Sequence, residues 1–265
     1  MSGTMLLYRN VTVLSYEEHK ELKLRPVAGF SFAEAMHWAP VAGVEFDQAS
    51  HSYPIMFVGE TNEDGYTSIT PILLLGLSAD RNDYIDADHN WKAETYLPAF
   101  VRRYPFIFAK VGDEEADELA VCFDAGFEGF NEQEGYPLFN EDGSLSDFLT
   151  DTINLISDFN AELDQTQEFI ELLMQYDLLV ERNIDIRNGH GTAFHLPGFL
   201  VINEEALTNL GQEQLETLNE RGFLGWAFAH LASLSNLSTL LDMHMTNRTA
   251  LPAASSEREH LLPME

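Results

Sequence analysis

The sequence predicts an α+β fold, in which an antiparallel β-rich N-terminal half is packed with a helix-rich C-terminal half. Two patterns indicate this division. Over residues 1–140, short apolar runs alternate with turns rich in Gly, Pro, Asn and Asp, which is typical of strands and hairpins. After Asp142 the apolar residues recur at helical spacing, yet strand-like runs return beyond the long helix. We therefore expect a single intertwined domain over residues 1–246, followed by a flexible tail over residues 247–265.

The N-terminal half is expected to consist mainly of short strands joined as hairpins. The expected strands are residues 6–14, 55–58, 68–77, 84–85, 106–111 and 119–123. Asp64-Gly65, between the second and third of these runs, is a hairpin turn signal, and the loop 112–118 joins the last two. Short helices are expected within residues 32–37 and over residues 97–104, where a proline suits the first turn.

The C-terminal half is expected to be mainly helical. One apolar stripe runs from Leu145 to Ile156 and a second from Phe169 to Tyr176, which predicts one bent helix or two helices. Further along, strands are expected at 179–186 and 192–202, with a break at Pro197-Gly198, and helices at 204–210, around 215–218 and over 223–241. The last helix is apolar over more than one face, which suits either a core position or a homodimer interface.

The composition restricts the classes of partner. The chain has 14 Lys and Arg against 44 Asp and Glu, which gives a formal net charge of −30. Such a surface repels nucleic-acid phosphates and anionic lipid headgroups, so we expect no nucleic-acid binding. The acidity suits a solvated surface or a docking face for a basic partner. The longest apolar run, residues 72–77, is too short to predict a membrane span.

Two features favour a cytoplasmic location. Cys122 is the only cysteine, so no disulfide can form within the chain, which is typical of a reducing compartment. The N-terminal residues lack the charged start and long apolar run of a signal peptide. Nucleotide-binding glycine motifs, nucleophile elbows and metal-ligand spacings are missing, and the acidic run 86–90 has only the start of a Ca²⁺ loop. We expect an Asx-type turn there, no metal and no cofactor.

The aromatic segment 96–108 places Arg102 and Arg103 side by side. On a helix, neighbouring side chains point about 100° apart, and on a strand they point to opposite faces. The two guanidinium groups are therefore expected to have different partners. Each one either pairs with an internal carboxylate, with its stem packed on an aromatic ring, or binds an anionic small-molecule ligand.

Glu45 lies in the apolar run Ala-Gly-Val-Glu-Phe, where a carboxylate needs a partner or a raised pKa. The preferred interpretation is a structural ion pair between Glu45 and either Arg102 or Arg103. The alternative is a general base in a pocket. Together with Tyr53 and Tyr104, these three residues are the predicted ligand-binding residues, and no catalytic residue is assigned.

Four blocks carry a family resemblance. They are Glu45-Phe46 with Tyr53-Pro54-Ile55-Met56-Phe57, then Leu74-Leu75-Gly76-Leu77 with Asp86-Ala87-Asp88 and Trp91, then the whole of 96–108, and last Gly198-Phe199 with Asn203-Glu204-Glu205 and Ala229-His230-Leu231. In order and spacing, over residues 6–243, the chain resembles the bacterial SapC family, which is distinct from the identically named peptide-transporter permease.

The resemblance implies several roles. The family name comes from an association with bacterial surface-layer proteins, and members tend to be encoded near flavin-dependent, tryptophan-halogenase-like proteins and TonB-dependent receptors. The leading hypothesis is therefore a binding or accessory protein that works beside a flavin-dependent enzyme or a TonB-dependent uptake system. One alternative is an enzyme of unrecognised type that acts on an anionic small molecule in a pocket lined by Glu45, Arg102, Arg103 and Tyr104. Another is a surface-layer-associated protein.

Overall fold

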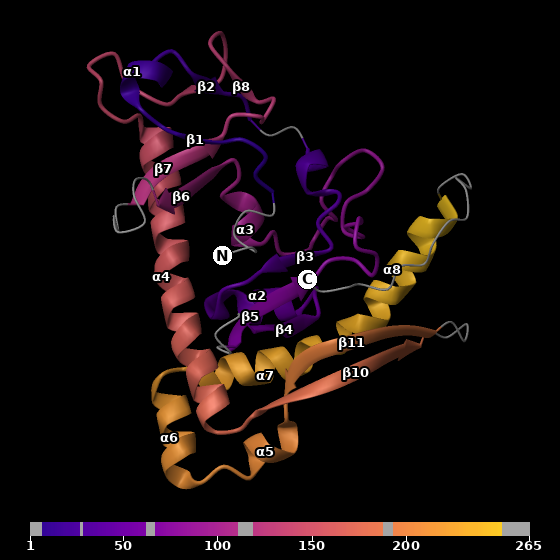
Figure 1. Cartoon of the computed structure of the whole chain (residues 1–265). Coiled ribbons are helices and arrows are strands. Elements are labelled where there is room, and N and C mark those ends of the chain that lie inside the picture. Colours follow the sequence, from indigo (N-terminus) through magenta and orange to yellow (C-terminus); the bar gives the residue numbers. More distant parts are fainter. Residues whose placement is uncertain (1–6, 27–28, 62–66, 111–118, 188–192, 251–265) are drawn as a thin grey trace.

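The structure is a computed structural model that describes residues 7–26, 29–61, 67–110, 119–187 and 193–250. Antiparallel sheets and helices share the chain, with most strands in the N-terminal half and most helices in the C-terminal half, which confirms the predicted α+β class. In Figure 1 the long helix α4 (Asp147–Gln175) runs beside the N-terminal sheets and ends among the C-terminal helices.

The largest sheet of the described residues joins both halves of the chain. Its order is β10-β11-β4-β5-β3, and each neighbouring pair is antiparallel. Its strands are β3 (Trp38–Pro40), β4 (Ile55–Thr61), β5 (Thr67–Leu74), β10 (Leu179–Arg187) and β11 (Ala193–Ile202). The pairing of β4 with β5 confirms the predicted hairpin, although its turn, residues 62–66, lies outside the described residues.

Strand β11 continues through Pro197-Gly198, where the sequence predicts a break. The register between β10 and β11 shifts between Arg182 and Ile184, so the strand absorbs the pair as a bulge instead of ending there. Gly198 has a φ of 79°, a left-handed conformation that glycine adopts without the steric cost of a side chain. The proline therefore interrupts the ladder locally without dividing the strand.

Two smaller sheets lie at the other end of α4 (Figure 1). One has the order β1-β7-β6 and the other β8-β2-β9. Their strands are β1 (Val11–Val13), β2 (Lys23–Leu24), β6 (Phe106–Lys110), β7 (Leu119–Asp124), β8 (Phe130–Asn131) and β9 (Tyr136–Pro137). The pairing of β6 with β7 confirms the predicted hairpin. The two-residue strands β2, β8 and β9 were not predicted, because so short a run shows no periodicity in the sequence. The strand expected at 84–85 is only a bridge between Ile85 and Trp91.

The helices differ from their predicted bounds mainly in length. The remaining α-helices are α1 (Tyr16–His19), α2 (Phe46–Ser50), α3 (Ala99–Arg102), α5 (Glu204–Thr208), α6 (Gln212–Glu220), α7 (Phe223–Ser233) and α8 (Asn236–Ala250). The helix expected over 97–104 shortens to α3, and the one expected within 32–37 is the 3₁₀ turn η2 (Ser31–Ala33). A second 3₁₀ turn, η3 (Gly43–Glu45), leads into α2.

The two ambiguous helical regions are also settled. Helix α4 is continuous over 29 residues, and Ser146 caps it by accepting a hydrogen bond of 3.1 Å from the Leu149 N–H. The helix expected over 223–241 is divided into α7 and α8. Helix α8 extends to Ala250 and includes the first four residues of the expected tail, whereas residues 251–265 lie outside the described residues. Within the described residues, no helix has the length and apolar character needed to cross a membrane.

Helix α4 connects two apolar clusters. Near its N-terminus, Leu149 and Ile156 pack with Phe106 in the smaller cluster. Further along, Phe159 and Phe169 belong to the main core, which also contains the buried strands of the largest sheet. One face of α4 is therefore packed against the rest of the protein along much of its length. Its segment 155–162, where the two clusters meet, forms one wall of a cavity.

Candidate functional site

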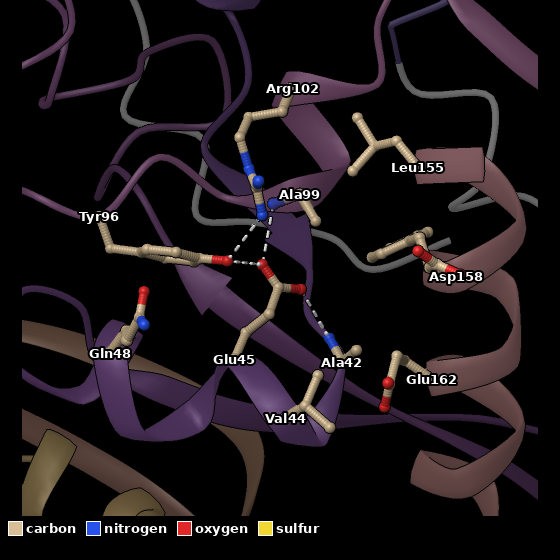
Figure 2. Close-up of a pocket in the computed structure, with 11 residues that line it drawn as sticks. Ala42, Val44, Glu45, Gln48, Tyr96, Ala99, Arg102, Leu155, Asp158 and Glu162 are labelled. Carbon is tan, nitrogen blue, oxygen red and sulfur yellow. Dashed lines mark hydrogen bonds between the residues drawn. The ribbon is translucent and has the colours of Figure 1, made fainter. Parts of the chain in front are cut away.

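A cavity of about 360 Å³ opens between three segments that are far apart in the sequence. Residues 42–48, from η3 and α2, form one wall, residues 96–102 lead into α3 and form the second, and residues 155–162 of α4 form the third. Figure 2 shows side chains from all three segments around this space. The volume lies within the range of small-molecule sites, which is roughly 300–1,000 Å³.

Glu45 ties two of these walls together. It ends η3, and only 6% of its surface is exposed. Its Oε1 accepts hydrogen bonds from the Tyr96 hydroxyl (2.8 Å) and the Ala99 N–H (2.8 Å), and its Oε2 accepts one from the Ala42 N–H (3.1 Å). The bond to Ala42 closes the turn reciprocally, because the Glu45 N–H donates to the Ala42 carbonyl. The buried carboxylate is thus satisfied by three donors.

The predicted ion pair of Glu45 with Arg102 or Arg103 is wrong. Among the described residues, Glu45 has no salt-bridge partner. Instead, Arg102 Nη2 donates to the Tyr96 hydroxyl (3.0 Å), which itself donates to Glu45, so the hydroxyl lies between the two charges (Figure 2). Burial, together with Glu45, raises the pKa of Tyr96 to about 12, so Tyr96 remains a donor at neutral pH.

The two arginines serve different environments, as the helical spacing predicts. Arg103 is 1% exposed, and its guanidinium lies 4.6 Å from the Phe100 ring centre and 4.9 Å from that of Phe159. Burial lowers the pKa of Arg103 from its usual value. Arg102 is exposed and lines the cavity, with its guanidinium 5.7 Å from the Tyr96 ring centre. Within the described part of the chain, Arg102 has no carboxylate at salt-bridge distance.

Tyr53 and Tyr104 do not line the cavity. The Tyr53 hydroxyl donates to the Tyr96 carbonyl and accepts from Trp91 Nε1 (2.9 Å), and burial raises the pKa of Tyr53 to about 12. The Tyr104 hydroxyl donates to Asp124 Oδ2 (3.0 Å), and burial raises the pKa of Tyr104. Tyr53 therefore supports the backbone behind Tyr96, while Tyr104 binds Asp124 and stacks on Phe32.

The acidic side chains that α4 contributes to the cavity were not among the predicted site residues. Asp158 and Glu162 both line the cavity, on the face that also presents Leu155 and the edge of Phe159. Among the described residues, neither carboxylate has a hydrogen-bond or salt-bridge partner. A signal was present, since 155, 158, 159 and 162 follow the i, i+3, i+4, i+7 spacing of one helix face, on which two acids interrupt an apolar stripe.

A second polar cluster attaches α8 to the loop that follows β5. Asp83 Oδ2 accepts from His244 Nδ1 (2.8 Å), and Asp83 Oδ1 accepts from Arg81 Nε (3.0 Å) and Asn247 Nδ2 (3.1 Å). His244 Nε2 lies 3.5 Å from the Ser78 hydroxyl, so the contacts follow the order of a Ser-His-Asp triad. The His244 and Asp83 side chains are 1% and 0% exposed, however, and this enclosure suits a structural connection.

Two smaller features concern single residues. Asp86 Oδ1 accepts hydrogen bonds from the N–H groups of Asn90 and Asp88 (2.9 Å each), which confirms the Asx-type turn and lowers the pKa of Asp86. His230, which lies in α7, is fully buried, and its Nε2 accepts a hydrogen bond of 3.1 Å from the Ile202 N–H. In the described ranges, His, Cys, Asp and Glu do not gather in threes as metal ligands would.

Comparison with known proteins gives one match. The sequence model of the SapC family matches residues 14–240, which is most of the 265-residue chain. No curated protein and no solved structure matches the chain. The match covers the walls of the cavity, from residue 42 to residue 162, as well as the central sheet. The chain therefore belongs to the SapC family.

Proposed function

We propose that this protein binds a small molecule bearing a carboxylate, and that Arg102 holds that carboxylate. The observation that carries the proposal is the placement of Arg102, a cation in a very acidic chain, on a cavity wall and away from salt-bridge distance of any described carboxylate. A guanidinium has five N–H donors and can bind a carboxylate with two of them. One Arg102 nitrogen, Nη2, contacts Tyr96, which orients the planar group without neutralising it.

The proposed role is a binding or accessory function rather than catalysis. Both Glu45 oxygens already accept hydrogen bonds, from Tyr96, Ala99 and Ala42, so the carboxylate of Glu45, although it lines the cavity, fits a structural acceptor better than a general base. This geometry favours the binding protein over the enzyme of unrecognised type. A surface-layer association is the other alternative, and detection of the chain in the surface fraction of its bacterium would favour it.

The partner in this proposal comes from the associations of the SapC family. We propose that the protein acts in the cytoplasm beside a flavin-dependent, tryptophan-halogenase-like enzyme or a TonB-dependent uptake system. Phe228 on α7 is 55% exposed, and with the half-buried Leu224 and Leu231 one turn away on either side it gives the helix an apolar face, on which we place the proposed protein contact, including a homodimer. Size-exclusion chromatography of the protein alone, and mixed with a flavin-dependent, tryptophan-halogenase-like enzyme from the same organism, tests both contacts. A monomer that does not co-elute with that enzyme contradicts them.

Binding of simple carboxylates tests the role of Arg102 directly. Calorimetry or ligand-observed NMR would follow acetate, 4-methylpentanoate and phenylacetate with the unchanged protein, Arg102→Gln and Arg182→Gln. Arg182 is an exposed arginine on β10, so its variant makes the same charge change away from the cavity. We expect Arg102→Gln to weaken binding at least about tenfold, as loss of a charge-assisted hydrogen bond does, and Arg182→Gln to leave it unchanged. Equal binding by all three proteins would contradict the proposal.

A further inference from the structure

The wall of the cavity opposite Arg102 carries negative charge. Asp158 and Glu162 lie one turn apart on α4, and both line the cavity. Like charges at this i, i+4 spacing destabilise a helix, and no described cation lies at salt-bridge distance of either carboxylate. In Figure 2 the two acids project from α4 on one side of the space, and the Arg102, Tyr96 and Glu45 group lies on the other side.

This charge distribution disfavours a ligand that is only an anion. Such a ligand would gain the contact with Arg102 but would meet two carboxylates, Asp158 and Glu162, for one guanidinium. Like charges brought together at this open site, where Arg102 and Asp158 are exposed and Glu162 is half-buried, still cost free energy, whereas an ammonium group placed near the α4 acids would gain it. The arrangement is therefore complementary to a molecule with both charges, its carboxylate toward Arg102 and its ammonium toward α4.

We propose that the ligand of this cavity is a zwitterion, namely an amino acid or a similarly small molecule with an ammonium group next to its carboxylate. The inference rests on the proposed binding of a carboxylate by Arg102 and adds a second recognition element. Val44 and Leu155 also line the space, so the remainder of the ligand is apolar. A cavity of about 360 Å³ has room for a molecule of this size.

Three matched ligands separate the two charges. L-Leucine has both charges, N-acetyl-L-leucine has only the carboxylate and L-leucinamide has only the ammonium; the same set built on L-phenylalanine covers an aromatic remainder. Ligand-observed NMR and calorimetry at pH 7 would measure the dissociation constant of each. We expect the free amino acid of at least one set to bind at least tenfold tighter than its acetylated form and its amide.

A pair of double variants assigns the ammonium contact to α4. In Asp158→Asn/Glu162→Gln, we expect binding of the free amino acid to weaken at least tenfold and binding of its acetylated form to stay equal or tighten. The control is Asp151→Asn/Glu171→Gln, which removes the same two charges from exposed positions of α4 outside the cavity. We expect the control to leave both affinities within twofold.

The outcomes distinguish the inference from the proposal on which it rests. If the acetylated form binds as tightly as the free amino acid and Arg102→Gln abolishes both, carboxylate binding stands and the zwitterion is excluded. If the two double variants behave alike, the α4 acids do not contact the ammonium and the inference fails. If neither free amino acid binds while a simple carboxylate does, the inference fails alone. If no carboxylate of any kind binds, both proposals fail.

Discussion

Arg102 and Arg103 are neighbours with identical side chains, yet they lie in opposite environments. Arg103 points into the protein and is 1% exposed between the rings of Phe100 and Phe159. Arg102 points outward and lines a cavity, where its guanidinium contacts the hydroxyl and the ring of Tyr96. The difference is produced by the short helix α3, which turns adjacent side chains about 100° apart.

The comparison shows that the role of a charged residue depends on what surrounds it. A buried cation is costly to desolvate, so Arg103 must be compensated by contacts that the fold makes permanent. An exposed arginine is hydrated, so the protein loses little stability when no protein group pairs with it. The N–H donors of Arg102 can therefore bind a ligand. Substitutions on the enclosed side should therefore change stability, and those on the open side should change binding.

The largest effect on stability is expected from Arg103→Ala. The change removes a side chain packed between two rings, loses cation–π contacts worth up to about 2 kcal/mol when desolvated and leaves a cavity. We expect the free energy of unfolding to fall by about 4 kcal/mol, measured by denaturant titration. Arg103→Met, which keeps a long side chain but no charge, should recover part of the loss. A loss below about 1 kcal/mol for the alanine variant would show that the enclosed side is not structural.

A second large effect is the acid sensitivity of the interior. Burial lowers the pKa of His230 from 6.5 to about 3, because the ring packs against Phe57 and water cannot solvate the positive charge of the protonated ring there. The unfolded chain takes up this proton below pH 6.5, whereas the folded protein stays neutral until about pH 3. The stabilising contribution is therefore complete above pH 6.5 and is lost as the pH falls toward 3.

Between pH 6.5 and pH 5 this linkage lowers the free energy of unfolding by about 2 kcal/mol. Denaturant titrations at pH 7, 6 and 5 would measure it in the unchanged protein and in His230→Gln. Burial also lowers the pKa of His37, but the variant leaves that contribution in place, so the difference in slope isolates His230. Equal slopes would contradict a neutral buried His230.

The same contrast explains what the sequence could predict. The adjacency of Arg102 and Arg103 was enough to predict that they have different partners, because neighbouring side chains point in different directions on a helix and on a strand alike. The apolar surroundings of Glu45 predicted that it is buried. Its partners were not predictable, because two of the three are backbone N–H groups, which every residue has, and the third is the hydroxyl of Tyr96, some 50 residues away.

The α4 wall was missed for a related reason. Asp158 and Glu162 look like ordinary solvated acids in a chain with 44 of them, and only the approach of residues 42–48 and 96–102 turns their surroundings into a cavity. Local patterns specify elements such as α4 and the β4–β5 hairpin. That three distant segments come together depends on packing across the whole domain, and the local hydrophobic periodicity of the sequence does not show such packing.

A smaller effect on stability is expected from Tyr96→Phe, which tests the link between the two sides. The variant removes the hydroxyl that donates to Glu45 and accepts from Arg102. We expect the free energy of unfolding to fall by about 1 kcal/mol, the usual value of one partly buried hydrogen bond, because Glu45 keeps its two backbone donors. Tyr136→Phe is the control, since Tyr136 is 51% exposed. Equal stabilities for the two variants would show that the Tyr96 hydroxyl is not a structural bridge.

The smallest effect on stability is expected at Arg102 itself. Arg102→Gln loses one hydrogen bond to Tyr96 and an exposed ring contact, so its free energy of unfolding should lie within about 0.5 kcal/mol of both the unchanged protein and Arg182→Gln. Thermal and denaturant unfolding of the three proteins measure this. A loss comparable with that of Arg103→Ala would mean that both arginines are structural, and the division between an enclosed and an open face of α3 would then be wrong. Because the charge at 102 contributes so little to stability, any loss of ligand binding in the variant reports on recognition and not on folding.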